Sequence, residues 1–244
     1  MTYNLKSGHA TLDDLVDGSL AKNVALQGAK TIFYVEGNSG SDTGGDGLTW
    51  ETAFKTLAVG LAASHADISS GNRGWASRNV ILCKGDYLDE DLVLLAQKTD
   101  VIGVGSVNAV QKCGLRGNHV PVTNDAFGTR FYNFFFIGDA TTGGDIWTLG
   151  SKNANVQFHD CTFHADSATA ATAAIVSTGS AFVEIHNCKF TGKFSDATIE
   201  FGNGDTAGVR VVGNYIESAA VGLHFNSGVL DRTSGEEQYI LVMD

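Results

Sequence analysis

Two stretches of the sequence share one pattern, VQFHDCTF at residues 156–163 and VEIHNCKF at residues 183–190. Each reads valine, polar, apolar, histidine, Asp or Asn, cysteine, polar, phenylalanine. Equivalent positions lie 27 residues apart, so the chain repeats itself over at least two copies. A fixed period of this length indicates a structure built by stacking copies of one unit.

The repeat extends to a column of Asn and Asp residues. Asp160 and Asn187 occupy the same position in the two copies, the same step backward reaches Asn133, and the same step forward reaches Asn214. Each residue follows a short run of β-forming residues. We interpret Asn133, Asp160, Asn187 and Asn214 as a structural ladder whose stacked side chains satisfy one another's hydrogen bonds.

The apolar residues of each copy predict a bend at the ladder position. Val156 and Phe158 precede Asp160, whereas Cys161 and Phe163 follow it. Side chains alternate along a strand, so both pairs reach one core only if the chain bends between them. Asp and Asn tolerate the left-handed conformation that such a bend uses.

The bend also decides between two uses of the histidines and cysteines. Two His-x-Cys pairs could supply the four ligands of a zinc site. With the bend in place, His159 and His186 point outward while Cys161 and Cys188 point inward, so they do not share such a site. The two cysteines fall within disulfide range of each other, but a core of free thiols explains them equally well.

Composition agrees with many short strands and limits the partners. Hydrophobic residues make up 43% of the 244 residues, and 30 glycines accompany a single proline, as expected for tight turns rather than disorder. The net charge of −11 argues against nucleic acid, and no apolar stretch is long enough to cross a membrane. The N-terminus lacks a signal-peptide pattern, so we expect folding in a cytoplasm.

The N-terminal half predicts a strand followed by a helix. Residues 32–35 are strand-like, and a polar, glycine-rich loop follows them. Thr49 then resembles a helix N-cap, and the segment 50–64 carries apolar residues at helical spacing. We expect Trp50 to pack this helix onto the coil.

This layout closely resembles the start of right-handed parallel β-helix proteins of the pectate-lyase-like group. In that group a segment of the form YV…GxD…G…AFxTL makes a strand and a capping helix, and VxLxxGxY opens the first coils. The resemblance covers roughly residues 32–228. The matching residues are Tyr34, Val35, Gly40, Asp42, Gly47, Thr49, Ala53, Phe54, Thr56, Leu57, Val80, Leu82, Gly85 and Tyr87.

Together, the repeat and the resemblance predict an all-β fold. We expect a single right-handed parallel β-helix of about six coils with a short N-terminal capping helix. The expected parts are an arm or docking segment at 1–31, the strand and capping helix at 32–77, and the β-helix at 78–244. The arm could instead only cover the open end of the coil.

The resemblance implies a choice of functions. Such β-helices occur in polysaccharide lyases and hydrolases, and in spikes, fibres and other surface proteins of bacteriophages, commonly as trimers. Our leading hypothesis is a structural protein of a bacteriophage particle, a capsid decoration, tail spike or fibre component. It would bind glycans, form a homotrimer, contact other particle proteins, and reach the virion surface after assembly in the host cytoplasm.

Two alternatives remain, a polysaccharide lyase or glycoside hydrolase and a bacterial surface adhesin. An enzyme would need paired carboxylates on one face. The weak candidates are Asp196 and Glu200, which could share a groove. No arginine motif of the pectate-lyase type is present, so the sequence leans away from enzyme activity. The carboxylates considered are Asp139, Asp145, Asp166, Asp196, Glu200 and Asp205.

Two further sets of residues could bind something. Glu36, Asp42 and Asp46 lie in one loop and are weak candidates for calcium, although turn chemistry alone explains them. No other cofactor is indicated. A glycan or partner face is predicted along the outward column, against the alternative of a plain solvated face. Its residues are Tyr132, His159, His186, Glu184 and Trp147, the last expected outward because it alternates with Ile146.

Overall fold

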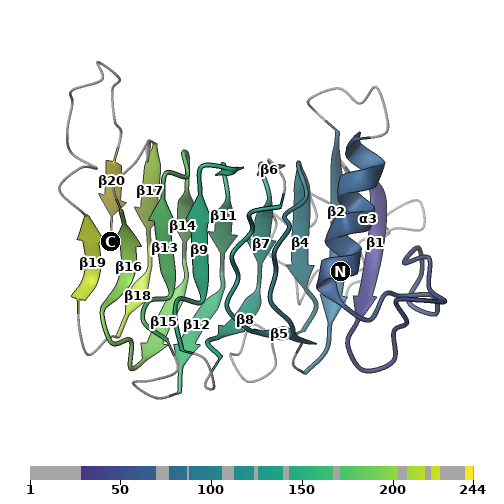
Figure 1. Ribbon diagram of the computed structural model, residues 1–244, viewed down its shortest axis with the longest axis horizontal. Coiled ribbons are helices and arrows are strands. Elements are labelled where there is room, and N and C mark those ends of the chain that lie inside the picture. Colours follow the sequence, from purple (N-terminus) through teal and green to yellow (C-terminus); the bar gives the residue numbers. More distant parts are fainter. Residues whose placement is uncertain are drawn as a thin grey trace, which may run out of the picture.

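The computed structural model of the protein describes residues 29–69, 77–86, 88–105, 113–123, 126–139, 143–166, 171–202, 208–217, 221–225 and 240–243. In this part of the chain the strands form a parallel β-solenoid with one helix (Figure 1). Most of the expected arm, together with Tyr87 and Asp205, lies outside the described residues.

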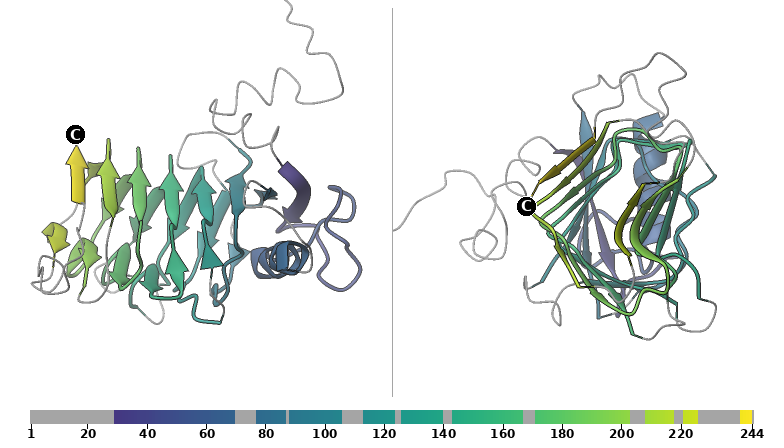
Figure 2. Two further views of the ribbon diagram at one scale, coloured as in Figure 1. Left: turned by 90° about the horizontal axis from the view of Figure 1, so that it is seen from above. Right: turned by 90° about the vertical axis from the view of Figure 1, so that its left-hand side faces the viewer.

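Three parallel sheets run along the solenoid, and we call them sheets A, B and C. Looking along the coil, they enclose one core (Figure 2). Sheet A contains β1 (Ala29–Glu36), β2 (Arg78–Lys84), β4 (Thr99–Gly103), β7 (Arg130–Tyr132), β11 (Gln157–His159), β14 (Glu184–His186), β17 (Val209–Val212) and β20 (Ile240–Met243).

The other sheets are shorter. Sheet B contains β3 (Leu88–Asp89), β5 (Cys113–Arg116), β8 (Phe134–Ile137), β12 (Thr162–Ala165), β15 (Lys189–Gly192) and β18 (Tyr215–Ile216). Sheet C contains β9 (Trp147–Gly150), β13 (Ile175–Thr178), β16 (Ala197–Phe201) and β19 (Val221–Phe225). Two short strands, β6 (Ala126–Phe127) and β10 (Asn153–Ala154), pair with each other.

The described part of the chain makes about four turns rather than the expected six. Sheet C has four strands, so only the turns that begin at β7, β11, β14 and β17 carry a strand in all three sheets. The chain after residue 78 includes the turns β2–β3 and β4–β5, which lack a sheet C strand. The six coils expected from the length of the chain are therefore not confirmed.

The ladder residues lie where sheet A turns into sheet B. Asn133, Asp160 and Asn187 have φ values of 60°, 54° and 51°, so the expected left-handed bend is present at all three. The fourth copy differs, because Glu184 pairs with Arg210 and the repeat there is one residue shorter. Gly213 takes the left-handed position with φ 65°.

The bend gives the solenoid a continuous aromatic core. Phe158 and Phe163, on either side of one bend, are both fully buried, with ring centroids 5.5 Å apart. Phe163 stacks on Phe190 of the next turn at 4.7 Å. Stacking identical side chains between turns removes a large apolar area from water, which is the main favourable term in the stability of this fold.

Trp147 belongs to this core, and its expected outward position is wrong. The ring is fully buried, as is Ile146 beside it. The backbone N–H groups of both residues donate to the next turn, to the carbonyls of Ala173 and Ala174. Consecutive residues that donate to the same side do not follow the alternation of a regular strand, so the parity argument fails here.

The helix begins later than predicted. Helix α3 spans Leu57–Ser69, and Thr56 rather than Thr49 lies at its N-terminus. The Thr56 side-chain oxygen accepts the N–H of Val59 at 3.4 Å. The Glu90 carboxylate accepts the first two helical N–H groups at 2.7 and 2.8 Å. Thr49 instead accepts the N–H of Thr52 in the preceding turn.

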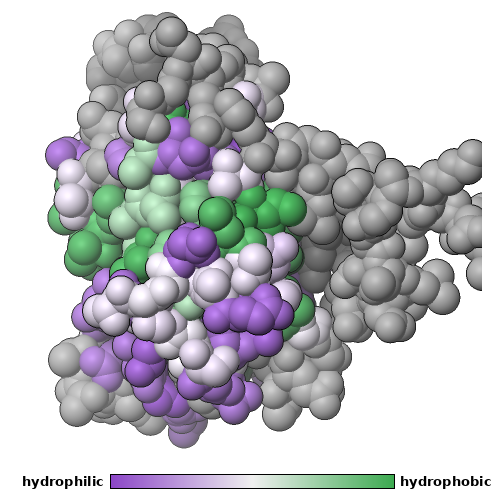
Figure 3. Space-filling view, turned by 90° about the vertical axis from the view of Figure 1, so that its right-hand side faces the viewer, coloured by the Kyte–Doolittle hydropathy of each residue, from purple (hydrophilic) through white to green (hydrophobic). Residues whose placement is uncertain are grey.

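Helix α3 packs against β1 and β2 at the N-terminal end of the solenoid (Figure 1). Its buried residues include Leu57, Gly60, Leu61 and Ile68. Apolar side chains form a band across this end of the molecule, with polar ones beside it (Figure 3). Trp50 lies outside the helix, edge-on to Tyr34 with centroids 4.8 Å apart and with the Lys84 ammonium 4.4 Å from its centroid.

Candidate functional site

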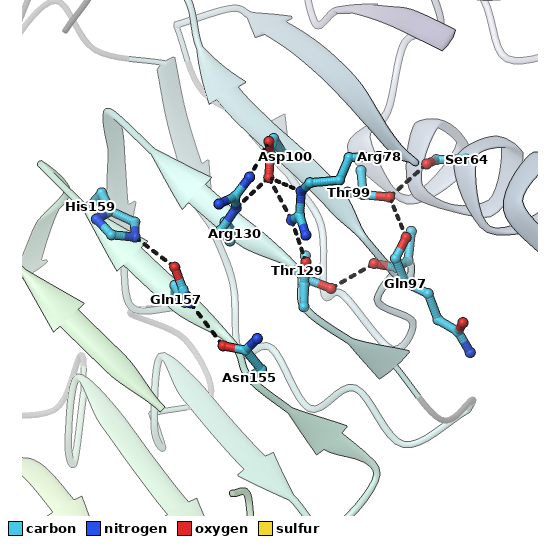
Figure 4. A network of polar contacts seen from close by, with 12 residues as sticks. Ser64, Arg78, Gln97, Thr99, Asp100, Thr129, Arg130, Asn155, Gln157 and His159 are labelled. Carbon is cyan, nitrogen blue, oxygen red and sulfur yellow. Dashed lines mark hydrogen bonds and ion pairs between the residues drawn. The ribbon is translucent and has the colours of Figure 1, made fainter. Parts of the chain in front are cut away.

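The outer face of sheet A carries polar contacts on several turns, one set around Asp100 and one around Gln157 (Figure 4). The parallel register aligns two columns of outward side chains. We call them the charged column and the ring column. The charged column contains Asp100, Arg130, Gln157, Glu184 and Arg210, and the ring column contains Tyr132, His159 and His186.

At one end of the charged column, Asp100 binds two arginines. Its side chain is 1% exposed, and its Oδ1 accepts Nη2 of Arg78 and Nε of Arg130, each at 2.6 Å. Nη2 of Arg130 also donates to Oδ2 at 2.6 Å, which makes that pair bidentate. Each guanidinium is about a quarter exposed and keeps N–H groups that Asp100 does not use.

The network is anchored to the helix. The hydroxyl of Ser64 in α3 lies 2.7 Å from that of Thr99, the residue before Asp100 (Figure 4). Nδ2 of Asn79 donates to the Ser64 hydroxyl at 3.2 Å. All three side chains are buried, so the N-terminal helix and the arginine pair share one rigid support.

The ring column is a stack. The ring of His159 lies 4.8 Å from that of Tyr132 and 4.9 Å from that of His186, with interplanar angles of 13° and 4°. These separations match the spacing of neighbouring strands. Because each ring covers the face of the next, the stack presents ring edges rather than ring faces to solvent.

Hydrogen bonds with the charged column fix the histidine edges. Nε2 of His159 lies 3.0 Å from Oε1 of Gln157, and Nε2 of His186 lies 2.8 Å from Oε2 of Glu184. Both oxygens are acceptors, so each Nε2 carries a proton. Burial, aided by the charge of His186, lowers the pKa of His159 to about 4, so its ring is neutral at pH 7.

The structure refines the predicted glycan or partner face. Tyr132, His159, His186 and Glu184 lie together on sheet A. Tyr132 is only 5% exposed, and burial raises the pKa of its hydroxyl to about 12. A ligand would therefore meet the histidine edges more than the tyrosine. Trp147 does not belong to this face, since it lies in the core.

Of the predicted ladder, only Asn133 is buried. Its Nδ2 donates to the carbonyl of Gly103 at 2.8 Å. Asn187 is exposed, so its expected role as a buried stacked amide is wrong. Asn214 lies one position past the column, where it bonds the backbone of the previous turn at Ile185 and Cys188.

Acidic side chains gather on the outer side of sheet C. Glu200 pairs in register with His224, and its Oε1 lies 4.0 Å from the imidazole Nδ1. Burial raises the pKa of Asp145, although the hydrogen bond from Thr148 opposes the rise, and the charges of Glu200 and Asp196 add to it. The two predicted catalytic candidates, Asp196 and Glu200, therefore lie close enough to raise the pKa of a third carboxylate, Asp145.

Sheet B carries a chain of polar groups that the sequence did not predict. Nδ1 of His164 lies 2.9 Å from the Thr191 hydroxyl, and its Nε2 lies 2.9 Å from Oδ1 of Asp166. Thr191 follows His164 by one repeat, which is the signal that could have found the pair. The order of groups resembles an activated hydroxyl nucleophile, but the Asp166 side chain is 62% exposed. We assign these contacts to the stability of the sheet.

The three calcium candidates are each engaged elsewhere. Glu36 contacts the ammonium of Lys84 at 2.5 Å, and Asp46 accepts the hydroxyl of Thr52 at 2.5 Å. Asp42 accepts two backbone N–H groups just before α3. Within the described residues, no three or more His, Cys, Asp or Glu side chains are arranged to hold a metal ion. Calcium binding in this loop stays a prediction that these contacts do not favour.

Comparison of the chain with protein-family models, with curated proteins and with solved structures finds no match. In the part of the chain that the structure describes, no helix has the length and apolar character needed to cross a membrane. The outer face of sheet A and the acidic group on sheet C are the parts of the described structure whose geometry suggests a function.

Proposed function

We propose that this protein is a structural component of a bacteriophage particle, a decoration, spike or fibre protein, that binds a polysaccharide along the outer face of sheet A. The ring column carries the proposal, because it repeats one hydrogen-bonding edge at the strand spacing. A polymer with regularly spaced hydroxyl groups is the ligand that such a row suits. The N–H groups of Arg78 and Arg130 that are accepted neither by Asp100 nor by the carbonyl of Gly128 favour an acidic glycan.

The rigidity of the site supports binding. The histidines are held by the charged column, and the arginines are held by a carboxylate that is almost fully buried. Side chains that are already ordered lose less entropy when a ligand arrives. Homotrimer formation, contacts with other particle proteins and a place on the virion surface belong to the same proposal.

Binding to a panel of acidic and neutral bacterial polysaccharides, measured by calorimetry, tests the site. We expect His159→Ala and His186→Ala each to weaken binding about five- to tenfold, the loss of roughly one hydrogen bond. His164→Ala, on sheet B, is the matched control and should leave affinity unchanged. Equal losses in all three variants, or no binding to any polysaccharide, would contradict the proposal.

The acidic group on sheet C favours a second candidate, a polysaccharide-degrading enzyme. A carboxyl with a raised pKa beside a second carboxylate is the arrangement of a general acid and its partner in glycoside hydrolysis. Asp145 would be the acid and Glu200 the partner. Release of reducing ends, absent in Asp145→Asn and Glu200→Gln, would move the protein to this class. Absorbance from unsaturated products would separate a lyase from a hydrolase.

A further inference from the structure

Two of the four cysteines meet inside the core. The Sγ atoms of Cys83 in β2 and Cys113 in β5 lie 3.3 Å apart, and both residues are buried. The two residues are 30 positions apart in the chain and belong to sheets A and B. We propose that Cys83 and Cys113 form a disulfide when the protein folds in an oxidising medium, and that the bond staples the N-terminal end of the solenoid.

Gly103 makes the approach of the two sulfurs feasible. It pairs in register with Cys83 on the next strand of sheet A. A Cβ atom placed on Gly103 would lie 3.2 Å from Cβ of Cys113 and 2.4 Å from the backbone oxygen of Asn133. A side chain at position 103 would therefore occupy the space into which Cys113 projects. The glycine leaves that space to the thiol pair.

The other two cysteines provide a contrast within the same chain. Cys161 and Cys188 occupy equivalent positions on neighbouring turns, and each thiol donates to a backbone carbonyl 3.3 Å away, that of His159 and His186 respectively. Their sulfur atoms are thus directed to the backbone, whereas the thiols of Cys83 and Cys113 are directed to each other. The disulfide considered from the sequence, between Cys161 and Cys188, is not the one that the geometry favours.

The bond forms by thiol–disulfide exchange with glutathione disulfide. One S–S bond forms between Cys83 and Cys113, the S–S bond of glutathione disulfide breaks, and the two thiol protons end on the two glutathione molecules released. Burial raises the pKa of Cys83, and its hydrogen bond with the Cys113 thiol raises it further, so the thiolate that exchange needs is rare in the folded core. Exchange therefore takes place while the chain is folding and the thiols are exposed.

The position of the bond defines its effect. It would join β2, on which α3 packs, to β5 of the following turn. Crosslinking residues this far apart in the chain removes conformations from the unfolded state and raises stability. For a chain of this size we expect the oxidised protein to melt about 10 °C above the reduced protein.

Oxidative refolding of the full chain tests the proposal. The protein is refolded in a glutathione redox buffer, denatured, and its thiols are counted with Ellman's reagent; a proteolytic digest is then searched for linked peptides by mass spectrometry. We expect two free thiols and one linked pair, Cys83 with Cys113. The double variant Cys161→Ala/Cys188→Ala should keep the bond and the higher melting temperature, while Cys83→Ala should show three free thiols.

Four free thiols after oxidative refolding would overturn the proposal, as would a linked pair of Cys161 with Cys188. Counting thiols on the unmodified chain does not depend on whether any variant folds, so the test stands without the variants. A linked pair with no rise in melting temperature would overturn the stapling role and leave only the bond.

Discussion

Among single residues, Asp100 has the largest expected effect on stability. Its carboxylate is 1% exposed and carries contacts from two arginines. Removing one partner of a buried charge pair leaves the other charges without compensation. Because both guanidinium groups are partly exposed and can recruit water, we expect Asp100→Asn to lower the free energy of unfolding by about 3 kcal/mol, less than a fully buried pair would lose.

The exposed pair of Arg116 and Asp89 is the control for this prediction. The two groups lie 3.2 Å apart, and both side chains are well exposed. Exposed ion pairs stabilise proteins little, so Asp89→Asn should change stability by less than about 0.5 kcal/mol. Denaturant melts of both variants make the comparison, and similar losses in the two would show that burial of Asp100 does not matter.

The ladder provides a second residue-scale prediction. Asn133 and Asn187 share a left-handed backbone with φ of 60° and 51°, so replacing either with alanine carries a similar backbone strain. Only Asn133 is buried and donates to the carbonyl of Gly103. We expect Asn133→Ala to lose about 1–3 kcal/mol more than Asn187→Ala in chemical denaturation. Equal losses would mean that the bend, not the buried amide, carries the stability of the column.

At the scale of elements, the helix shows what a sequence can and cannot predict. The existence of a capping helix followed from local spacing, but its start did not. Thr49 and Thr56 are equally good caps by residue type. The helix starts after Thr56 because Asp42 and Glu90 accept N–H groups at that point, and both residues are distant from the helix start in the sequence. Long-range partners of this kind leave no local pattern.

The outer face of sheet A likewise has residues that the sequence predicts and residues that it does not. The ring column follows the 27-residue repeat, so Tyr132, His159 and His186 could be placed together from spacing alone. Asp100 pairs in register with Arg130, but the turn between them is longer than the repeat. The same counting therefore misses Asp100 and Arg78. Regular turns are predictable by period, and irregular turns are not.

Helix α3 gives a prediction whose sign opposes helix propensity. Gly60 lies in the helix interior, where alanine is normally favoured by about 1 kcal/mol. A Cβ atom at position 60 would lie 2.8 Å from Cγ2 of Val35 in β1. We expect Gly60→Ala to destabilise the protein by about 1–3 kcal/mol, because the helix must move off the sheet.

A double-mutant cycle identifies the cause of that loss. Val35→Ala alone opens a cavity, whereas in the Gly60→Ala background it also relieves the contact. The double variant should therefore be more stable than the sum of the two single losses predicts. Additive losses, or a stabilising Gly60→Ala, would show that α3 is not pressed against β1 at this point.

For the whole molecule, the core predicts the response of stability to acid. His119 is fully buried, its Nδ1 accepts the N–H of Leu92 at 3.2 Å, and its ring lies 4.5 Å from that of Trp147. Burial lowers its pKa to about 3. His159, on the outer face, has a pKa lowered to about 4. The folded protein therefore keeps both rings neutral at a pH where the unfolded chain binds protons on them.

The sign of the effect follows from this difference. Between pH 6.5 and 3 the unfolded state binds a proton on His119 that the folded state does not, so stability rises with pH in that window. The contribution of neutral His119 to the free energy of unfolding is fully present above pH 6.5, and it falls by up to about 1.4 kcal/mol per pH unit on acidification. His119→Phe should remove this part of the slope and leave the part from His159.

Urea melts of the wild type and His119→Phe at several pH values test the prediction. The carboxylates whose pKa burial raises, Asp145 and Glu90, are common to both proteins, so their effects cancel in the difference between the two curves. Above pH 7 neither His119 nor His159 changes protonation, and the two curves should run parallel whatever the variant costs in packing. As the pH falls, the difference between the curves should then shift in favour of His119→Phe, because only the wild type loses the contribution of His119. Curves that stay parallel down to pH 4 would mean that the aromatic core of the solenoid accommodates a protonated His119, which contradicts the prediction.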